Sequence, residues 1–167
     1  MECPRQDPYA ASAATASGIY AWCGIGEMPW PEGFPAVRSS MPLYIGIAES
    51  ETLAERIVGC HLSRTRGSAL RRSLSALLVD ELNLGSHIIR GSQARPSKYG
   101  MEPEGERILT DWMLANLRVA WLECAGPGAI EGSLIASLLP PLNDVYAAGS
   151  PYRTAMRALR ATVAASG

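Results

Sequence analysis

Two short strand-like segments, separated by a long Gly- and Pro-rich stretch, constrain the fold of this chain more than any other feature. The first is GIYAWC at residues 18–23, and the second is LYIGIA at residues 43–48. Both combine β-branched and aromatic residues, which favour strands. The stretch between them, residues 24–42, is too long for a tight hairpin turn, and long loops inside compact domains are usually functional or mobile. The pattern therefore predicts two strands joined by a loop that shapes a binding surface.

Most of the remaining chain has a helical pattern. Ser50 is the expected N-cap of a helix over residues 51–62, and Ser68 is the expected N-cap of a helix with leucines at helical spacing from Leu70 to Leu82. Further along, the pattern predicts a short edge strand at 88–90, a helix at 104–117, a strand at 118–124, and helices at 129–139 and 154–165.

The N-terminal residues 1–17 have neither a helical nor a strand period and are rich in Ala, Ser and Pro. Such a composition predicts a flexible arm. The pattern that follows predicts a single domain over residues 18–167, which ends in a helix.

The composition is that of one globular domain. Of the 167 residues, 47% are hydrophobic and 19% are charged, and the apolar runs are far shorter than a membrane-spanning helix. A secretory signal pattern is absent, so we expect a cytoplasmic location and no membrane association. The net charge of −1 argues neither for nor against a nucleic-acid partner. No CxxC pair is present, which argues against a zinc or redox motif and predicts buried thiols at Cys3, Cys23, Cys60 and Cys124.

The two strand-like segments carry the tripeptides Gly18-Ile19-Tyr20 and Tyr44-Ile45-Gly46. Arg56 lies on the helix expected after the second strand, and Glu131 lies on a helix after the third strand, twelve residues before Asn143. Either tripeptide alone would recur by chance, but four elements in this order over about three quarters of the chain are specific. In these residues the chain resembles the GIY-YIG nuclease family.

The resemblance implies a mixed α/β (α+β) fold, in which helices flank a small central antiparallel three-stranded sheet. It also implies cleavage of nucleic-acid phosphodiester bonds with one divalent metal, Mg²⁺ or Mn²⁺. Glu131 would be the metal ligand, because magnesium accepts a single carboxylate together with waters and a substrate phosphate. Arg56 would stabilise charge on the scissile phosphate. The alternative for both residues is a solvated position on a helix surface.

Tyr20 and Tyr44 correspond to the tyrosine pair of the family. One of them is taken as the general base toward water and the other orients the water or the phosphate, and which does which stays open. A tyrosine with an ordinary pKa near 10 is a poor base at neutral pH, so the metal or a nearby cation or base must favour the phenolate. Asn143 resembles the family asparagine that braces the active site, although an Asn after two prolines is also common in turns.

Two positions depart from the family pattern. Ile47 directly follows the second tripeptide, where many members have a lysine that assists tyrosine deprotonation. Some restriction enzymes of the family have a histidine one helical turn after the arginine. Here that position is Cys60, and His61 comes one residue later. At ~100° per residue His61 lies well away from Arg56 on an ideal helix, so a role as proton acceptor requires the helix to distort near Gly59.

A basic stripe with five arginines and no acidic residue runs from position 56 to position 72. Contacts with flanking DNA phosphates, which make affinity salt-dependent, are expected from Arg64, Arg66, Arg71 and Arg72. The alternative is a solvated helix face. A second basic patch comprises Arg153, Arg157 and Arg160. The aromatic residues that could stack on an unpaired base are Trp22, Trp30 and Tyr99.

The sequence therefore predicts a metal-dependent endonuclease acting on double-stranded or structured DNA, in a restriction-like or repair role. No separate DNA-binding module is visible, so the domain itself, a homodimer or a partner protein must find the target. One alternative is a nucleic-acid-binding or assembly module that keeps the fold without efficient catalysis, consistent with Ile47 and the shifted His61. The other is a cysteine hydrolase in which Cys60 pairs with His61 or His87.

Overall fold

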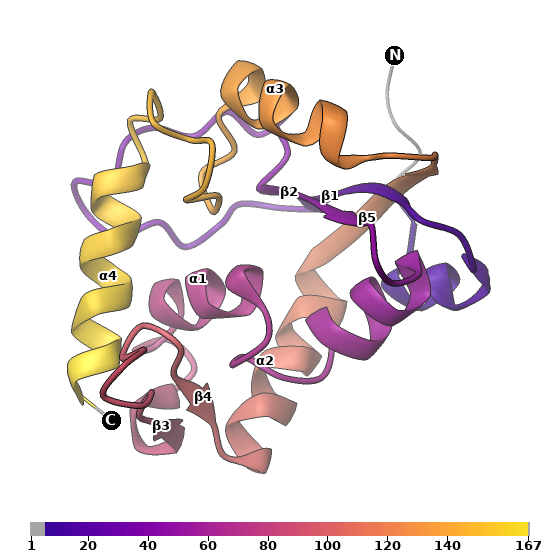
Figure 1. Cartoon of the computed structure of the whole chain (residues 1–167). Helices are drawn as coiled ribbons and strands as arrows, with labels where there is room; N and C mark the ends of the chain where they lie inside the picture. The colour runs from indigo at the N-terminus through magenta and orange to yellow at the C-terminus, as the bar shows by residue number, and fades with distance from the viewer. Residues whose placement is uncertain (1–5, 167) are drawn as a thin grey trace.

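The computed structural model describes residues 6–166. In chain order the elements are η1 (Pro8–Ala13), β1 (Gly18–Gly24), β2 (Tyr44–Ala48), η2 (Glu55–His61), α1 (Ala69–Leu77), η3 (Leu84–His87), β3 (Ile88–Ile89), β4 (Gly100–Met101), α2 (Pro103–Asn116), β5 (Leu117–Glu123), α3 (Gly128–Leu138) and α4 (Arg153–Ser166). A three-stranded antiparallel sheet has the strand order β2-β1-β5, with α3 on one side and α1 and α2 on the other (Figure 1). This is the fold that the sequence predicted.

The register of the sheet places the two tyrosines on one face. Tyr20 of β1 lies opposite Gly46 of β2, and Trp22 lies opposite Tyr44. Side chains on alternate positions of a strand share a face, so the side chains of Tyr20 and Tyr44 both lie on the side of α1. A Cβ atom at Gly46 would press against the hydroxyl of Tyr20. Glycine at this position therefore leaves room for that hydroxyl.

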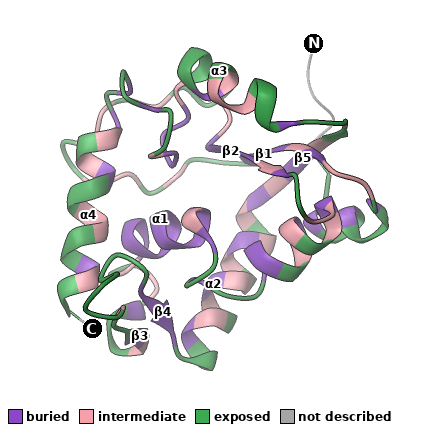
Figure 2. Cartoon of the chain, in the orientation of Figure 1, coloured by how far each residue is buried: buried purple, intermediate pink, exposed green. Residues whose placement is uncertain are grey.

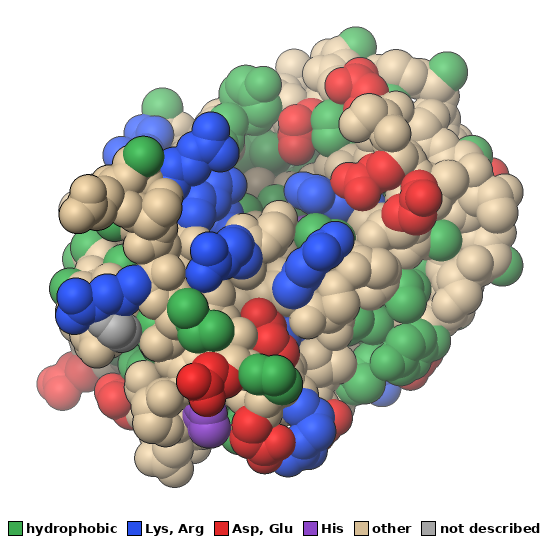
Figure 3. All heavy atoms as spheres, turned by 60° about the horizontal axis from the view of Figure 1, so that its bottom comes forward, with side chains coloured by type: hydrophobic (Ala, Val, Ile, Leu, Met, Phe, Trp, Pro, Cys, Tyr) green, Lys and Arg blue, Asp and Glu red, His purple; other side chains and the backbone are tan. Residues whose placement is uncertain are grey.

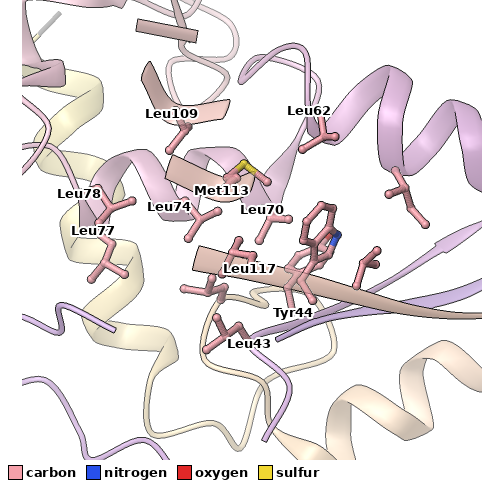
Figure 4. Packing of buried hydrophobic residues seen from close by; sticks show 14 of the residues in the cluster. Leu43, Tyr44, Leu62, Leu70, Leu74, Leu77, Leu78, Leu109, Met113 and Leu117 are labelled. Atoms are coloured by element: carbon pink, nitrogen blue, oxygen red, sulfur yellow. The ribbon is translucent and has the colours of Figure 1, made fainter. Parts of the chain in front are cut away.

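The main core fills the space between this face of the sheet and the helices α1 and α2 (Figure 4). α1 contributes Leu70 and Leu74 and α2 contributes Leu109 and Met113, all of them fully buried. α1 is buried along most of its length, whereas α3 and α4 each expose one side (Figure 2). Full burial of a leucine side chain stabilises a fold by about 1.5–3 kcal/mol, so these helices hold the sheet in place.

A smaller apolar cluster on the opposite face of the sheet positions α3. Ile135 of α3 packs with Ile45 of β2, and Ile19 and Ala21 of β1 border the cluster. Residues four apart share one side of a helix, so Glu131 lies on the same side of α3 as Ile135. The packing of this helix therefore brings Glu131 next to the edge strand β2.

Hydrogen bonds cover part of each outer edge of the sheet. On the β5 edge, the N–H groups of Gln6 and Val119 each donate to the carbonyl of the other, at 2.9 and 3.0 Å. On the β2 edge, the side chain of Asn143 accepts a hydrogen bond from the Ile45 N–H at 2.9 Å and donates one to the Ile45 carbonyl at 2.8 Å. These contacts protect both edges from pairing with another chain.

The segment from Gln6 to Ser17 is packed onto the domain, where the sequence predicted a flexible arm over residues 1–17. Its 3₁₀-helix η1 contacts η2, and Ala11 and Ala14 are buried in the main core. Alanine is small enough to be buried without a strong hydrophobic period, which is why the pattern gave no signal. Residues 1–5 of the predicted arm lie outside the described residues.

The helix after β2 begins at a different cap from the one expected. Ser50 was the predicted N-cap, but the Glu55 N–H donates to Thr52 Oγ1 at 3.1 Å and the Thr52 N–H donates to Glu55 Oε2 at 2.7 Å. This reciprocal capping box satisfies two backbone donors at once. The following residues, Glu55–His61, form a π-helix rather than a regular α-helix.

Two other elements differ from the sequence-based expectation. α1 ends at Leu77 instead of continuing toward Leu82. The strand expected at 88–90 pairs with β4 in a separate two-stranded sheet, so it is not an edge of the main sheet. Within the described residues, no helix is both long and apolar enough to cross a bilayer.

Candidate active site

The hydroxyl of Tyr20 lies between a histidine and an arginine. Its oxygen is 2.6 Å from Nε2 of His61 and 3.4 Å from Nε of Arg56, which donates to it. The side chain of Tyr20 is only 1% exposed. A buried phenol with a base on one side and a cation on the other is arranged for proton transfer.

The π-helix brings His61 and Arg56 to the same hydroxyl. The two residues are five positions apart, and an ideal α-helix would point them in different directions. π-helical hydrogen bonds connect residues five apart, and such distortions are frequent at functional sites. The helix therefore departs from regular α-helical geometry, as a role for His61 as proton acceptor requires. A carbonyl of this helix, that of Gly59, also accepts a hydrogen bond from the Ser63 hydroxyl.

The other ring nitrogen of His61 is held by Ser68. His61 Nδ1 is 2.6 Å from Ser68 Oγ, which also accepts the Arg71 N–H at 3.0 Å as the N-cap of α1. We assign the Nδ1–H tautomer of His61, because Ser68 then accepts from Nδ1 and Nε2 is free to accept from the Tyr20 hydroxyl. The sequence pointed to Ser68 only as a helix cap, and its contact with His61 was not predicted.

Burial sets the protonation state of these groups. It lowers the pKa of His61 well below its usual value, and Arg56 and Arg71 lower it further. Burial also raises the pKa of Tyr20 well above 10, with a smaller contribution from Tyr44, and Arg56 opposes this rise. At neutral pH, His61 is therefore uncharged and Tyr20 keeps its proton.

Arg71 is buried and holds the backbone of His61 in place, so its side chain does not face the solvent. Its side chain is fully buried, and Nη2 forms an ion pair with Glu106 Oε2 of α2 at 2.7 Å. Nη1 donates to the His61 carbonyl at 3.1 Å and to Thr110 Oγ1 at 2.9 Å. The prediction that Arg71 binds DNA is therefore wrong, because its guanidinium is already satisfied inside the protein.

A hollow of about 440 Å³, here called the β2 hollow, opens beside the edge strand β2. Residues that line it include Tyr44, Arg72, Lys98, Glu131, Asn143 and Arg160. Tyr44 is 8% exposed, and its ring centre lies 6.5 Å from that of Tyr20. Burial raises the pKa of Tyr44, while Arg56 lowers it and Glu131 raises it. Tyr44 and the candidate metal ligand Glu131 therefore line the same cavity.

Glu131 is suited to bind a divalent cation together with a substrate. No hydrogen bond or ion pair holds its carboxylate among the described residues. Burial raises the pKa of Glu131, while Arg56 lowers it and Glu49 raises it. A bound cation would stabilise this carboxylate. No group of three His, Cys, Asp or Glu side chains in residues 6–166 could form a complete metal cage. The residues therefore fit a sparse magnesium site that a phosphate and waters complete.

Arg56 lies at a second opening, which we call the η2 hollow. It is lined by Arg56, Arg64 and Arg66 together with Glu51 and Glu55. Arg56 Nη1 is 3.3 Å from Glu51 Oε1, an ion pair that is partly exposed. Arg64 and Arg66 are exposed, so both side chains are accessible to a nucleic acid.

On the face drawn in Figure 3, Lys and Arg side chains gather in a broken band from the left edge to the centre of the view. Arg72 is nearly buried but lines the β2 hollow. Arg153 and Arg157 of the second basic patch both pair with Asp144, at 3.1 and 2.6 Å. This pairing reduces the charge that those two arginines present to a ligand.

The expected stacking residues are mostly in the core. Trp22 and Tyr99 are fully buried, and Trp30 stacks on Phe34 at a centroid distance of 4.8 Å. The sequence missed Tyr146, which is 56% exposed and lines the β2 hollow. Its position in an irregular segment carried no pattern that would single it out.

The structure does not support a cysteine hydrolase at Cys60. The thiol is near Arg56 Nη1 at 3.8 Å, and both ring nitrogens of the adjacent His61 are engaged by Tyr20 and Ser68. No histidine is hydrogen-bonded to Cys60 among residues 6–166, so the pair that activates a nucleophilic thiol is missing there.

The fold and the site together define a class of small α/β domain. In this chain two tyrosines lie on neighbouring strands, an arginine follows on the next helix, and a glutamate lies at the edge of the sheet. A comparison with family models matches residues 18–162 to the GIY-YIG catalytic domain, and the chain belongs to that family. The domain is of the nuclease type, which implies a nucleic-acid substrate. No curated protein and no solved structure matches the chain.

Proposed function

We propose that this protein is a metal-dependent endonuclease that hydrolyses DNA phosphodiester bonds. The observation that carries the proposal is the placement of the Tyr20 hydroxyl 2.6 Å from His61 Nε2 and within reach of Arg56. This arrangement supplies a base in place of the lysine that many family members have at the position of Ile47. It also favours Tyr20 over Tyr44 as the general base, because Tyr44 has no hydrogen bond to a base within the described residues.

As a water molecule attacks phosphorus, it passes a proton to the Tyr20 oxygen while the Tyr20 hydroxyl proton moves to Nε2 of His61, so no free phenolate has to form beforehand. The guanidinium of Arg56 stabilises the negative charge that develops on the Tyr20 oxygen. The phosphorus–oxygen bond to the leaving strand breaks. The leaving oxygen takes up a proton and His61 releases one, so the net reaction adds one water across the bond.

Glu131 would hold one Mg²⁺ or Mn²⁺ ion, and the charge that such an ion would supply is what a developing phosphate dianion needs for stabilisation. Arg56 also faces the η2 hollow, where it can contact the same phosphate and complement its charge. Tyr44 lines the β2 hollow and orients the water or the phosphate. Asn143 fixes the edge strand that carries Tyr44 through its two hydrogen bonds to Ile45.

The same proposal includes the features expected from the sequence. The substrate is double-stranded or structured DNA, and the role is restriction-like or in DNA repair. The nuclease domain covers residues 18–167, with the segment from Gln6 to Ser17 packed against it, and acts in the cytoplasm by itself, as a homodimer or with a partner protein. Arg64 and Arg66 bind flanking phosphates.

Cleavage of supercoiled plasmid, linear duplex and branched DNA tests the proposal. We expect cutting with Mg²⁺ or Mn²⁺, no cutting with EDTA, and at least a hundredfold slower cutting by Glu131→Gln, because the carboxylate that holds the ion is lost. Glu123→Gln removes an exposed carboxylate from β5 and serves as the matched control. If the folded protein binds these DNAs but cuts none with any metal, the domain is instead a binding or assembly module.

A further inference from the structure

Three cationic side chains surround the β2 hollow from three separate parts of the chain. Arg72 belongs to α1, Lys98 follows the β3 strand in the loop before β4, and Arg160 belongs to α4. Lys98 is the only lysine of the chain. The fold therefore gathers positive charge on the wall that faces Tyr44 and Glu131.

None of these cations has a carboxylate partner within the described residues. Within residues 6–166, Nη1 is the one nitrogen of the Arg72 guanidinium that is hydrogen-bonded, to the carbonyls of Thr65 and Arg66 at 3.2 and 2.7 Å. Arg72 is only 4% exposed, and its buried Nε has no partner in the part of the chain that the structure describes. An unsatisfied donor on a buried charge is costly, so an anion bound in the β2 hollow, which Arg72 lines, would lower the cost of this buried guanidinium.

The two acidic side chains that line the β2 hollow, Asp144 and Glu131, do not pair with these three cations. Asp144 is bound by Arg153 and Arg157, which lie outside the set of three cations. Glu131 is the proposed metal ligand. The three cations also repel one another: Arg72 contributes most to lowering the pKa of Lys98, and Arg160 adds to burial in lowering the pKa of Arg72. A bound anion would relieve this repulsion.

We propose that Arg72, Lys98 and Arg160 bind a second phosphate of the nucleic-acid strand, adjacent to the phosphate that is cleaved. The inference rests on the proposed function, because Tyr44 and Glu131 form part of the same hollow. Phosphate suits the site because arginine and lysine donors form charge-assisted hydrogen bonds to its oxygens. The group is either an internal phosphodiester or a terminal monophosphate, which share this chemistry.

Equilibrium binding in EDTA tests the subsite without cleavage. The full chain is compared with the double variant Lys98→Gln/Arg160→Gln, which leaves the buried Arg72 in place to preserve folding. Arg107→Gln is the surface control, which removes one positive charge elsewhere: Arg107 is exposed on α2 and pairs with Glu104 and Asp111. The probe is a short fluorescent duplex, titrated over a range of salt concentrations.

We expect the double variant to bind about tenfold more weakly than the full chain. The slope of the logarithm of its binding constant against the logarithm of the salt concentration should be smaller in magnitude by about one, because a single phosphate contact is lost. Arg107→Gln should change neither quantity. An unchanged affinity would overturn the proposal. A slope reduced by about two would also overturn it, because the two side chains would then contact separate phosphates.

Duplexes with 5′-phosphates, duplexes without them and closed dumbbell DNA distinguish the two phosphate sources. A tenfold difference that persists on the dumbbell assigns the subsite to an internal phosphodiester, whereas a difference seen only with 5′-phosphates assigns it to a terminal monophosphate. Cleavage of the same DNAs in Mg²⁺ is scored separately. Subsite binding without any cleavage would reject only the endonuclease, and cleavage with unchanged binding would reject only the subsite.

Discussion

Tyr20 begins a line of three side chains, Tyr20, His61 and Ser68, that are joined by two hydrogen bonds of 2.6 Å each. Each member has a defined donor or acceptor role in the resting state, because His61 is neutral and donates from Nδ1. Proton movement along this line needs no rearrangement of the backbone. Glycine at position 46 and the π-helix are the two local features that make the line possible.

The buried neutral state of His61 predicts how stability depends on pH. In the unfolded chain a histidine takes up a proton as the pH falls through about 6.5, whereas folded His61 resists protonation because its pKa is lowered. The free energy of unfolding should therefore be nearly insensitive to this group above about pH 7.5. It should be about 1.4 kcal/mol lower at pH 5.5 than at pH 7.5 because of this one group.

Urea denaturation at the two pH values measures this effect. His61→Gln should remove most of the pH-dependent loss, whatever its effect on stability at pH 7.5. His87→Gln, at a half-buried histidine, should retain the loss. An equal loss in the wild type and in His61→Gln would show that His61 is not held neutral.

At the scale of elements, the site depends on contacts between η2, α1 and α2. Glu106 of α2 accepts hydrogen bonds from the Thr65 N–H at 2.7 Å and from Arg71 Nη2 at the same distance. Arg71 in turn donates to the His61 carbonyl at the end of η2. This buried network fixes the end of the π-helix, and with it the position of the imidazole.

Removal of Arg71 should be strongly destabilising. Arg71→Leu leaves the Glu106 carboxylate largely buried without its cation, which typically costs about 3–5 kcal/mol in free energy of unfolding. Arg107→Leu on the same α2 helix as Glu106 breaks only exposed ion pairs with Glu104 and Asp111, which solvent screens, and should lower the free energy of unfolding far less. Urea denaturation at pH 7.5 compares the two. Similar losses for both variants would contradict the structural role given to Arg71.

At the scale of the whole molecule, local patterns predicted the sheet and the residues at its centre. Strand propensity identified β1 and β2, and the two tripeptides carried Tyr20 and Tyr44 with them. The structure confirms the three-stranded antiparallel sheet, and it brings both Arg56 and His61 to the hydroxyl of Tyr20. These features depend on residues close together in the chain or on a family pattern.

Contacts over long sequence distances were not predictable in this way. A run of arginines does not show which member finds a carboxylate elsewhere, so the pairing of Arg71 with Glu106 was missed. Lys98 and Arg160 come together in the β2 hollow from separate elements, without any shared motif. The packing of η1 was missed for a similar reason, because its alanines gain their burial from η2 and the core.

The central claim is that the Tyr20 hydroxyl activates water for phosphodiester cleavage, and single-turnover cleavage of DNA by Tyr20→Phe tests it most directly. General-base catalysis typically contributes 10²–10⁴-fold, so we expect the variant to cut slower by about that factor and to bind DNA normally. Tyr152→Phe also removes a buried hydroxyl, one that donates to the Ala36 carbonyl away from the site, and should cut at the wild-type rate. Wild-type cutting by a folded Tyr20→Phe would contradict the account.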